Sequence, residues 1–169
     1  MTTNKHLARK RIHMPLGWVT VTRSARGLSG LWFDGQKHFP EGLDAVPVDE
    51  TDALLLRAEK ALLAYFEGKP FPADLLKQLD PQGTPFQQDV WRALLEIEPG
   101  GSDSYGALAR KLGRPQAVRA LGAAVGRNPI SILIPCHRVL GAGGELTGYA
   151  GGIDRKTALL TLEGASFRA

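Results

Sequence analysis

The chain has 169 residues, of which 43% are hydrophobic and 22% are charged, a composition typical of a globular rather than a disordered protein. No apolar run approaches the roughly 20 residues that a membrane helix needs, and the basic segment 1–13 lacks the apolar core of a signal peptide. We therefore expect a cytoplasmic protein with no membrane partner. The single cysteine excludes an internal disulfide and a cysteine-rich zinc cluster, and the four histidines are scattered, so we assign no metal.

The formal net charge of +4 is unevenly distributed along the chain. Residues 101–169 contain nine Lys and Arg against four Asp and Glu, whereas the first 100 residues carry a net charge of −1. A basic half suits a polyanionic partner, nucleic acid first. On charge alone, a solubilising surface explains the same excess about as well.

The first 83 residues predict a small mixed α and β region. Apolar alternation over 17–33, interrupted at 24–27, indicates a β-hairpin, and 34–47 is expected to be a loop or a short edge strand. Segment 49–68 predicts a helix that ends at Gly68, and the Pro-rich segment 69–83 is the expected linker. We expect a solvated basic tail at Lys5, Arg9, Lys10 and Arg11. The apolar stripe of the helix consists of Leu54, Leu55, Ala58, Leu62, Tyr65 and Phe66.

The second half of the chain predicts several short helices. Thr84 and Gln87 form a capping box around Pro85, which predicts a helix that ends before 99–101. Ser104 is a candidate cap for a helix that ends at Gly113, and a further helix is expected from Pro115 to Gly126. Two short helices joined through a glycine turn resemble a helix-turn-helix. A glycine-rich loop over 141–152 precedes a closing helix, for which Asp154 is the expected cap.

The helix expected after Pro115 has an unusual composition for a DNA-reading helix. Small residues allow a close approach to a shallow target such as the minor groove, and the long side chain of Arg119 could enter the base stack. The alternative is an alanine face packed in a core, which explains the small residues but not Arg119. The small residues are Ala117, Ala120, Gly122, Ala123 and Ala124.

The segment around Cys136 places a thiol between Pro135 and two basic side chains, His137 and Arg138. A neighbouring imidazole or cation lowers the pKa of a thiol and favours the reactive thiolate, so we interpret Cys136 as reactive rather than as an inert buried residue. Neighbours in an extended chain point to opposite sides, so a bridging water is the easier link between the thiol and His137. An acid is needed to hold the tautomer of His137, and Glu163 is a candidate.

Five motifs in order complete the pattern: FQQDVW, SYGALA, NPI followed by PCHRV, GYAGG and LLTLEG. Together they resemble the O6-alkylguanine-DNA alkyltransferases, also called methylated-DNA–protein-cysteine methyltransferases, densely over 84–164 and more weakly at the front. The resemblance implies an α+β fold with a sheet-plus-helix domain at 1–80 and a mainly helical domain at 81–169 that carries a helix-turn-helix. It also implies a free monomer that binds double-stranded DNA containing O6-alkylguanine in the minor groove.

The resemblance further implies a role for each matching residue. Cys136 would accept the alkyl group, with His137 as its water-linked base and Glu163 orienting His137. Tyr105 would protonate the departing guanine, Asn128 would brace the turn, and Arg119 would fill the gap left by the flipped nucleotide. Ala117, Ala120, Gly122 and Arg138 would contact DNA, and Val139, Ser131 and Tyr149 would line the pocket. The reaction needs no metal or cofactor, and without a second thiol Cys136 would stay alkylated after one turnover.

Three other functions fit parts of the pattern. A catalytically silent DNA binder would tolerate replacement of Cys136 and would prefer a DNA sequence. A lesion sensor of the same fold would lack the acceptor cysteine, which is present here. A thiol hydrolase using Cys136, His137 and Asn128 would turn over steadily on an ester or amide. We rank all three below the alkyltransferase.

Overall fold

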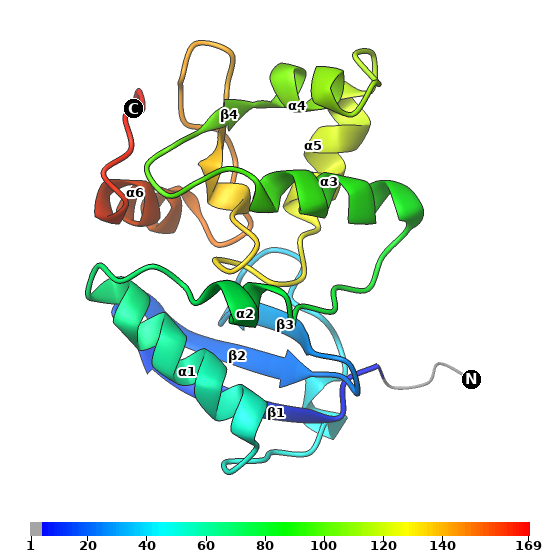
Figure 1. Cartoon of the computed structure of the whole chain (residues 1–169), viewed down its shortest axis with the longest axis vertical. Helices are drawn as coiled ribbons and strands as arrows, with labels where there is room; N and C mark the ends of the chain where they lie inside the picture. The colour runs from blue at the N-terminus through cyan, green and yellow to red at the C-terminus, as the bar shows by residue number, and fades with distance from the viewer. Residues whose placement is uncertain (1–4) are drawn as a thin grey trace. The chain divides into compact units, whose positions relative to one another are not determined.

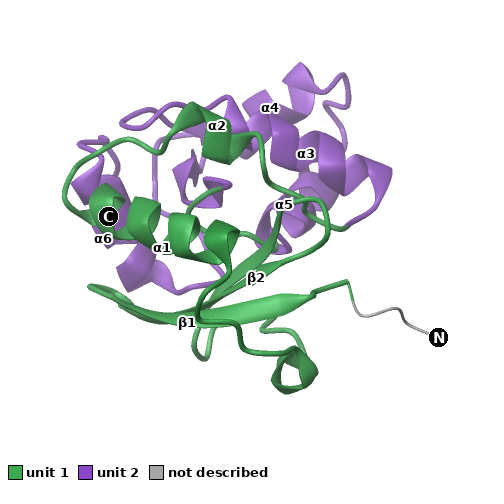
Figure 2. Cartoon of the chain, turned by 60° about the horizontal axis from the view of Figure 1, so that its bottom comes forward, with its two compact units in different colours: residues 1–82, 129–133 green, residues 83–128, 134–169 purple. Residues whose placement is uncertain are grey.

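The computed structural model describes residues 5–169, which divide into two compact units (Figure 2). The first unit comprises residues 1–82 together with 129–133, and the second comprises 83–128 and 134–169. The division after Gln82 lies close to the boundary expected after residue 80. The sequence did not predict that segment 129–133 belongs to the first unit.

The first unit is built on a three-stranded antiparallel sheet in the order β1 (Ala8–Met14), β2 (Gly17–Arg23), β3 (Leu28–Phe33). Helix α1 (Ala53–Phe66) packs against β1 and β2 (Figure 1). The predicted hairpin is therefore confirmed, and its inward side chains Val19, Val21, Leu31 and Phe33 are fully buried.

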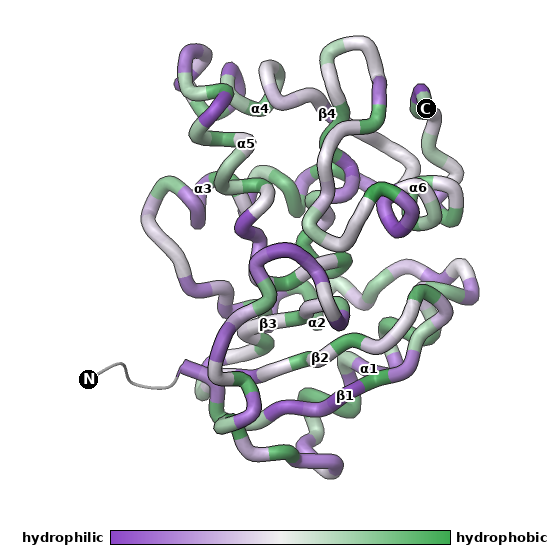
Figure 3. Tube along the Cα trace, turned by 180° about the vertical axis from the view of Figure 1, so that it is seen from behind, coloured by the Kyte–Doolittle hydropathy of each residue, from purple (hydrophilic) through white to green (hydrophobic). Residues whose placement is uncertain are grey.

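The expected solvated N-terminal tail is instead strand β1 from Ala8 onward, in which Lys10 is buried and Arg9 half-buried while Arg11 is exposed. Alternate residues of the strand are buried, three of them apolar and the fourth Lys10, and the residues between them are hydrophilic (Figure 3). The Nζ atom of Lys10 lies 2.5 Å from a carboxylate oxygen of Glu50 and 3.6 Å from one of Glu59. These two acids make an inward-facing lysine tolerable, because a buried cation needs an opposite charge. The strand therefore forms in a sequence that resembles a charged tail.

Helix α1 lies within the segment predicted to be helical, 49–68, and begins at Ala53. The side chain of Asp52 accepts a hydrogen bond from the backbone amide of Leu55, and Gly68 follows the helix with a φ of 90°, in the left-handed region that favours glycine. The segment expected to be a linker is instead packed on this unit: it forms the short helix α2 (Ala73–Leu76), in which Leu75 is fully buried. A 3-10 turn, η1 (Leu43–Ala45), lies in the predicted loop.

Segment 129–133 extends the sheet of the first unit at β3. The amide of Leu31 donates to the carbonyl of Pro129 at 2.8 Å, and the amide of Ser131 donates back to Leu31 at 3.1 Å. Ile132 then takes a φ of 71°, which is unusual for a β-branched residue. Pairing with β3 thus makes this segment part of the first unit.

The second unit contains the remaining helices and a two-stranded parallel sheet (Figure 1). The capping box of Thr84 and Gln87 and the cap by Ser104 are both confirmed. The indole Nε1 of Trp91 donates to the carbonyl of Ala124 at 2.9 Å and so ties α3 to α5. The elements are α3 (Pro85–Leu95), β4 (Asp103–Ser104), α4 (Tyr105–Lys111), α5 (Val118–Gly126), η2 (Cys136–Arg138), β5 (Val139–Leu140) and α6 (Ile153–Leu162).

Two helix starts differ from the prediction. Helix α5 begins at Val118 rather than at Pro115, because 115–117 continue the turn that follows Gly113. Helix α6 has Gly152 as its N-cap with no capping side chain, so the expected cap by Asp154 is wrong; Asp154 lies within the first turn. None of the helices in the described part of the chain combines the length and the apolar character of a transmembrane span.

Candidate active site

The parallel pair β4 and β5 organises the site within the second unit. Asp103 pairs with Val139 and Ser104 with Leu140, so the start of α4 lies beside the segment that directly follows η2. Tyr105 is the first residue of α4 and Cys136 is the first residue of η2. Tyr105 follows the end of β4 and Cys136 precedes the start of β5, and the negative charge of a Cys136 thiolate would raise the pKa of Tyr105, so two residues 31 positions apart belong to one site.

Cys136 is buried, with 5% of its surface exposed. Burial raises the pKa of its thiol to about 11, against the opposing effects of a hydrogen bond from Asn128 and the positive charge of Lys156. Asn128 also donates through Nδ2 to the carbonyl of Ile134 at 2.8 Å and so closes the turn that leads to the cysteine. At neutral pH the resting protein therefore holds a protonated thiol, which needs a base before it can attack.

His137 is the candidate base, and its surroundings fix its tautomer. Its Nε2 atom lies 2.9 Å from a carboxylate oxygen of Glu163, which can only accept, so this nitrogen carries the proton. Burial lowers the pKa of His137, partly offset by Glu163. The neutral ring thus presents Nδ1 as an acceptor, and this atom is buried without a hydrogen-bond partner among residues 5–169. Such a nitrogen can take up a proton.

Arg138 has a structural role that differs from the predicted one. Its Nε and one terminal nitrogen donate to the two oxygens of Glu163 at 2.9 and 2.8 Å, and the other donates to the carbonyl of Ile97 at 2.5 Å. The side chain is buried, so the expected DNA contact of Arg138 is not available to it. Instead this bidentate pair holds the carboxylate that orients His137.

Tyr105 lies at one end of a polar chain that the sequence did not predict. Its hydroxyl is 2.8 Å from Oγ1 of Thr147, and the same Oγ1 is 3.0 Å from Nζ of Lys156. Lys156 is fully buried and also donates to the carbonyl of Val139 at 2.7 Å. Burial raises the pKa of Tyr105, so its hydroxyl stays protonated at neutral pH. One signal could have revealed Lys156: it shares a helical stripe with Leu159, Leu160 and Glu163.

The other predicted pocket residues belong to both units. Val139 is fully buried next to η2, and Tyr149 is half-buried in the loop that follows Thr147. Ser131 is buried within the first unit, on the segment that pairs with β3.

The small residues and Arg119 that were expected at the DNA surface differ in exposure along α5 (Val118–Gly126) and its N-cap. Arg119, Ala120 and Ala123 are exposed, whereas Ala124 is buried against α3. Ala117 and Gly122 are half-exposed, and a Cβ at Gly122 would lie 3.8 Å from the ring of Tyr105. The exposed face of α5 therefore carries small residues and one long cation, as the minor-groove hypothesis requires.

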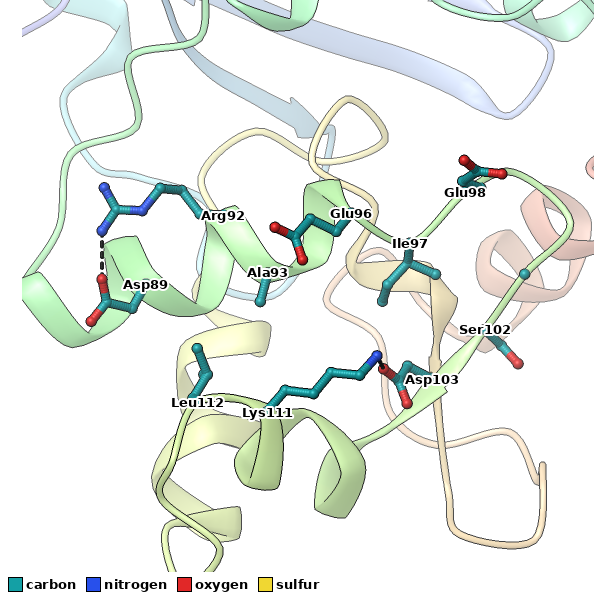
Figure 4. A pocket seen from close by; sticks show the side chains of 11 residues that line it. Asp89, Arg92, Ala93, Glu96, Ile97, Glu98, Ser102, Asp103, Lys111 and Leu112 are labelled. Carbon is teal, nitrogen blue, oxygen red and sulfur yellow. Dashed lines mark hydrogen bonds and ion pairs between the residues drawn. The ribbon is translucent and has the colours of Figure 1, made fainter.

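A cleft of about 580 Å³ lies elsewhere in this unit, between α3, α4 and the segment that joins α3 to β4 (Figure 4). Its cations are paired with acids: Arg92 with Asp89, and Lys111 with Asp103. The lining includes four acids, Asp89, Glu96, Glu98 and Asp103. An acidic lining repels phosphate, so this cleft does not suit DNA. Within residues 5–169, no cluster of three or more His, Cys, Asp or Glu side chains could hold a metal ion.

Comparison with known proteins shows which family combines these features. Residues 85–165 match the family model of the 6-O-methylguanine DNA methyltransferase DNA-binding domain. The methylated-DNA–protein-cysteine methyltransferase of Methanosarcina barkeri is 43% identical over 160 residues, which is 93% of this chain and 97% of that protein. The chain belongs to this family.

Solved structures of similar proteins support the α+β fold of this alkyltransferase. The structure of Mycobacterium tuberculosis OGT in complex with DNA has a TM-score of 0.83 and 43% identity, covering 93% of this chain and 92% of that one. The O6-methylguanine-DNA methyltransferase of Pyrococcus kodakaraensis has a TM-score of 0.66 and 26% identity over 94% of this chain and 99% of that one. The alkyltransferase is thus a DNA-binding repair protein.

Proposed function

We propose that this alkyltransferase transfers the alkyl group of an O6-alkylguanine in duplex DNA to Cys136, once and irreversibly. The main support for the proposal is the buried thiol of Cys136 next to His137. The Nε2–H group of His137 donates to Glu163, which leaves Nδ1 as the acceptor. The thiol pKa of about 11 means that attack needs a base, and the neutral ring of His137 supplies one.

The reaction follows from these groups. His137 takes the thiol proton through Nδ1, directly or through a water, and Sγ of Cys136 attacks the alkyl carbon. The S–C bond forms as the bond between that carbon and O6 breaks, and the electron pair moves onto the guanine. Tyr105 donates a proton to a ring nitrogen of the guanine, which then leaves as the neutral base. The product is a thioether, which water does not hydrolyse.

DNA would reach this site through the exposed face of α5. The damaged base must leave the duplex because its alkyl group is enclosed by the stack, and flipping costs a few kcal/mol. Small residues at 120 and 123 permit close approach to the minor groove, and Arg119 is the long exposed side chain placed to fill the vacated position. Helices α4 and α5 would act as the helix-turn-helix. The monomeric free form and the cytoplasmic location stay predictions.

Stoichiometry tests the proposal against a hydrolase. A limiting amount of protein is mixed with excess duplex containing O6-methylguanine, and restored guanine is measured over time. We expect the product to plateau at one guanine per protein, with none formed by Cys136→Ser. Continued turnover beyond that plateau, or repair by Cys136→Ser, would refute the proposal.

A further inference from the structure

The glycine-rich loop at residues 141–149 carries two residues of the candidate site, Thr147 and Tyr149. The hydroxyl of Thr147 lies 2.8 Å from that of Tyr105, and Tyr149 is half-buried. Four of the nine residues in this loop are glycines. Glycine loses more conformational freedom than any other residue when its backbone is ordered. A loop of this composition therefore depends on contacts from outside itself to keep one conformation.

Two main-chain hydrogen bonds join this loop to Arg168, near the end of the chain. The amide of Arg168 donates to the carbonyl of Gly144 at 2.8 Å, and the amide of Leu146 donates to the carbonyl of Arg168 at 2.9 Å. The two bonds form a parallel bridge in which Arg168 pairs with Glu145. The second bond therefore restrains the residue that directly precedes Thr147.

The side chains of Glu145 and Arg168 approach the same point of the loop. A Cβ atom placed on Gly143 would lie 2.8 Å from a carboxylate oxygen of Glu145 and 3.9 Å from Nη1 of Arg168. Both side chains are exposed, so the attraction between their charges adds little. The main-chain bonds of Arg168 therefore provide most of the restraint.

The segment that contains Arg168 starts where helix α6 ends, and we call its residues 166–169 the strap. Glu163 is the C-cap of α6. Gly164 then takes a φ of 74°, in the left-handed region that favours glycine, and the amide of Ala165 donates to the carbonyl of Leu160 at 3.0 Å. These features end the helix and turn the chain back toward the loop.

We propose that the strap positions loop 141–149 for the transfer reaction and thereby favours small alkyl groups over large ones. The inference rests on the proposed function. With the strap paired, Thr147 stays beside the hydroxyl of Tyr105. Without it, the glycine-rich loop gains other conformations, and a methyl group loses the close placement against Sγ of Cys136 that fast transfer needs. A benzyl group makes more contacts of its own and has a more reactive carbon, so it depends less on the loop.

The test compares two substitutions that remove the same charge. Arg168→Pro removes the amide that donates to Gly144, and the extended conformation of a bridge residue tolerates a proline. Arg168→Ala keeps the amide and is the matched control, so any lost contact with DNA phosphate is common to both variants. Termination of the chain after Phe167 is a second way to remove both hydrogen bonds.

Two measurements are made on each variant. Hydrogen exchange followed by mass spectrometry reports the order of the peptide that covers the loop. Single-turnover transfer to Cys136 is followed by intact mass at saturating duplex that contains either O6-methylguanine or O6-benzylguanine.

Relative to Arg168→Ala, we expect Arg168→Pro to speed exchange of the loop amides about 3- to 10-fold, as the loss of one hydrogen bond predicts. Methyl transfer should slow by a similar factor, whereas benzyl transfer should change by less than about twofold. The chain that ends at Phe167 should behave like Arg168→Pro. Thermal unfolding should stay unchanged, because the bonds hold a loop rather than the core.

Loop amides that exchange equally slowly in Arg168→Pro and Arg168→Ala would overturn the inference, because the pairing would then not hold the loop. So would faster exchange with both transfer rates unchanged, or an equal loss with both alkyl groups. Failure of the unmodified chain to transfer either group to Cys136 would instead overturn the proposed function. The exchange measurement does not depend on transfer, so the two failures are distinguishable.

Discussion

At the scale of single residues, the site depends on charges that are buried and mutually paired. Glu163 accepts from both His137 and Arg138, and all three side chains are shielded from solvent. In such a cluster the loss of one partner leaves another charge uncompensated. Residues that never touch the substrate therefore control both stability and the state of the base.

We expect Arg138→Ala to lower the free energy of unfolding by about 3–5 kcal/mol, because the carboxylate of Glu163 would stay buried without its cation. Urea denaturation followed by circular dichroism measures the change. Arg127→Ala, at an exposed position, is the control and should change stability by less than about 0.5 kcal/mol. If Arg138→Ala cost no more than this control, Arg138 would not support Glu163.

The pH dependence of transfer to Cys136 is predicted by the lowered pKa of His137. A depressed pKa keeps the ring neutral, and able to accept a proton, at and below its usual value of 6.5. The rate with free O6-benzylguanine should therefore be retained as the pH falls to 6.5 and should decline only below it. The same group should contribute stability above pH 6.5 that is lost as the pH falls through its folded-state pKa. A rate that already declines between pH 8 and 7 would contradict the assignment, and His137→Gln should abolish this acid limb.

Residue types allowed part of this site to be predicted. Cys136 and His137 are adjacent and chemically conspicuous, Glu163 was a candidate acid for His137, and the resemblance added the role of Tyr105. Arg138 was expected to contact DNA, and only its burial and its hydrogen bonds to Glu163 show that its charge is used internally. Thr147 was missed because its contact with Tyr105 depends on a distance between segments that no local pattern encodes, whereas Lys156 was missed although it shares a helical stripe with Leu159 and Leu160.

At the scale of elements, helix α5 is where packing and recognition meet. One face packs through Leu121, Ala124 and Val125, and the other exposes Arg119 and Ala120. Ala124 was expected among the small residues that approach DNA but is buried, and the start of the helix was predicted three residues early, because Pro115 can begin a helix or continue a turn. Strand β1 was missed because its basic residues resemble a solvated tail. Its inward Lys10 is paired with Glu50, which lies 40 residues away in the sequence.

We expect Arg119→Ala to slow repair of O6-methylguanine in duplex DNA roughly 10- to 100-fold, the equivalent of a flipping cost of a few kcal/mol. Transfer from free O6-benzylguanine should be unchanged, because a free base needs no extrusion. Arg110→Ala, at an exposed position of α4, is the control for lost charge. Equal losses on duplex and free base would remove Arg119 from base flipping.

At the scale of the whole molecule, only the exposed cations of the basic half can contribute to binding DNA phosphates. Of the nine cations in 101–169, Arg138 and Lys156 are buried and Lys111 is paired with Asp103. Fewer cations than the sequence suggests are therefore free to meet phosphate. Besides Lys111, the exposed cations are Arg110, Arg114, Arg119, Arg127 and Arg168.

If two to four of these cations contact phosphate, the affinity for duplex DNA should fall roughly 10- to 100-fold between 50 and 200 mM salt, through release of condensed counterions. Fluorescence anisotropy with undamaged duplex measures this slope. An affinity that does not change with salt would contradict docking led by phosphate contacts.

The central claim, that Cys136 is consumed as the acceptor, is tested most directly by mass spectrometry. The protein is incubated with duplex containing O6-methylguanine, and the intact mass and the peptide masses are then measured. The account predicts one added methyl group, located on the peptide that contains Cys136 and absent in Cys136→Ser. Restored guanine in the DNA with an unmodified Cys136, or a methyl group on another residue, would contradict it.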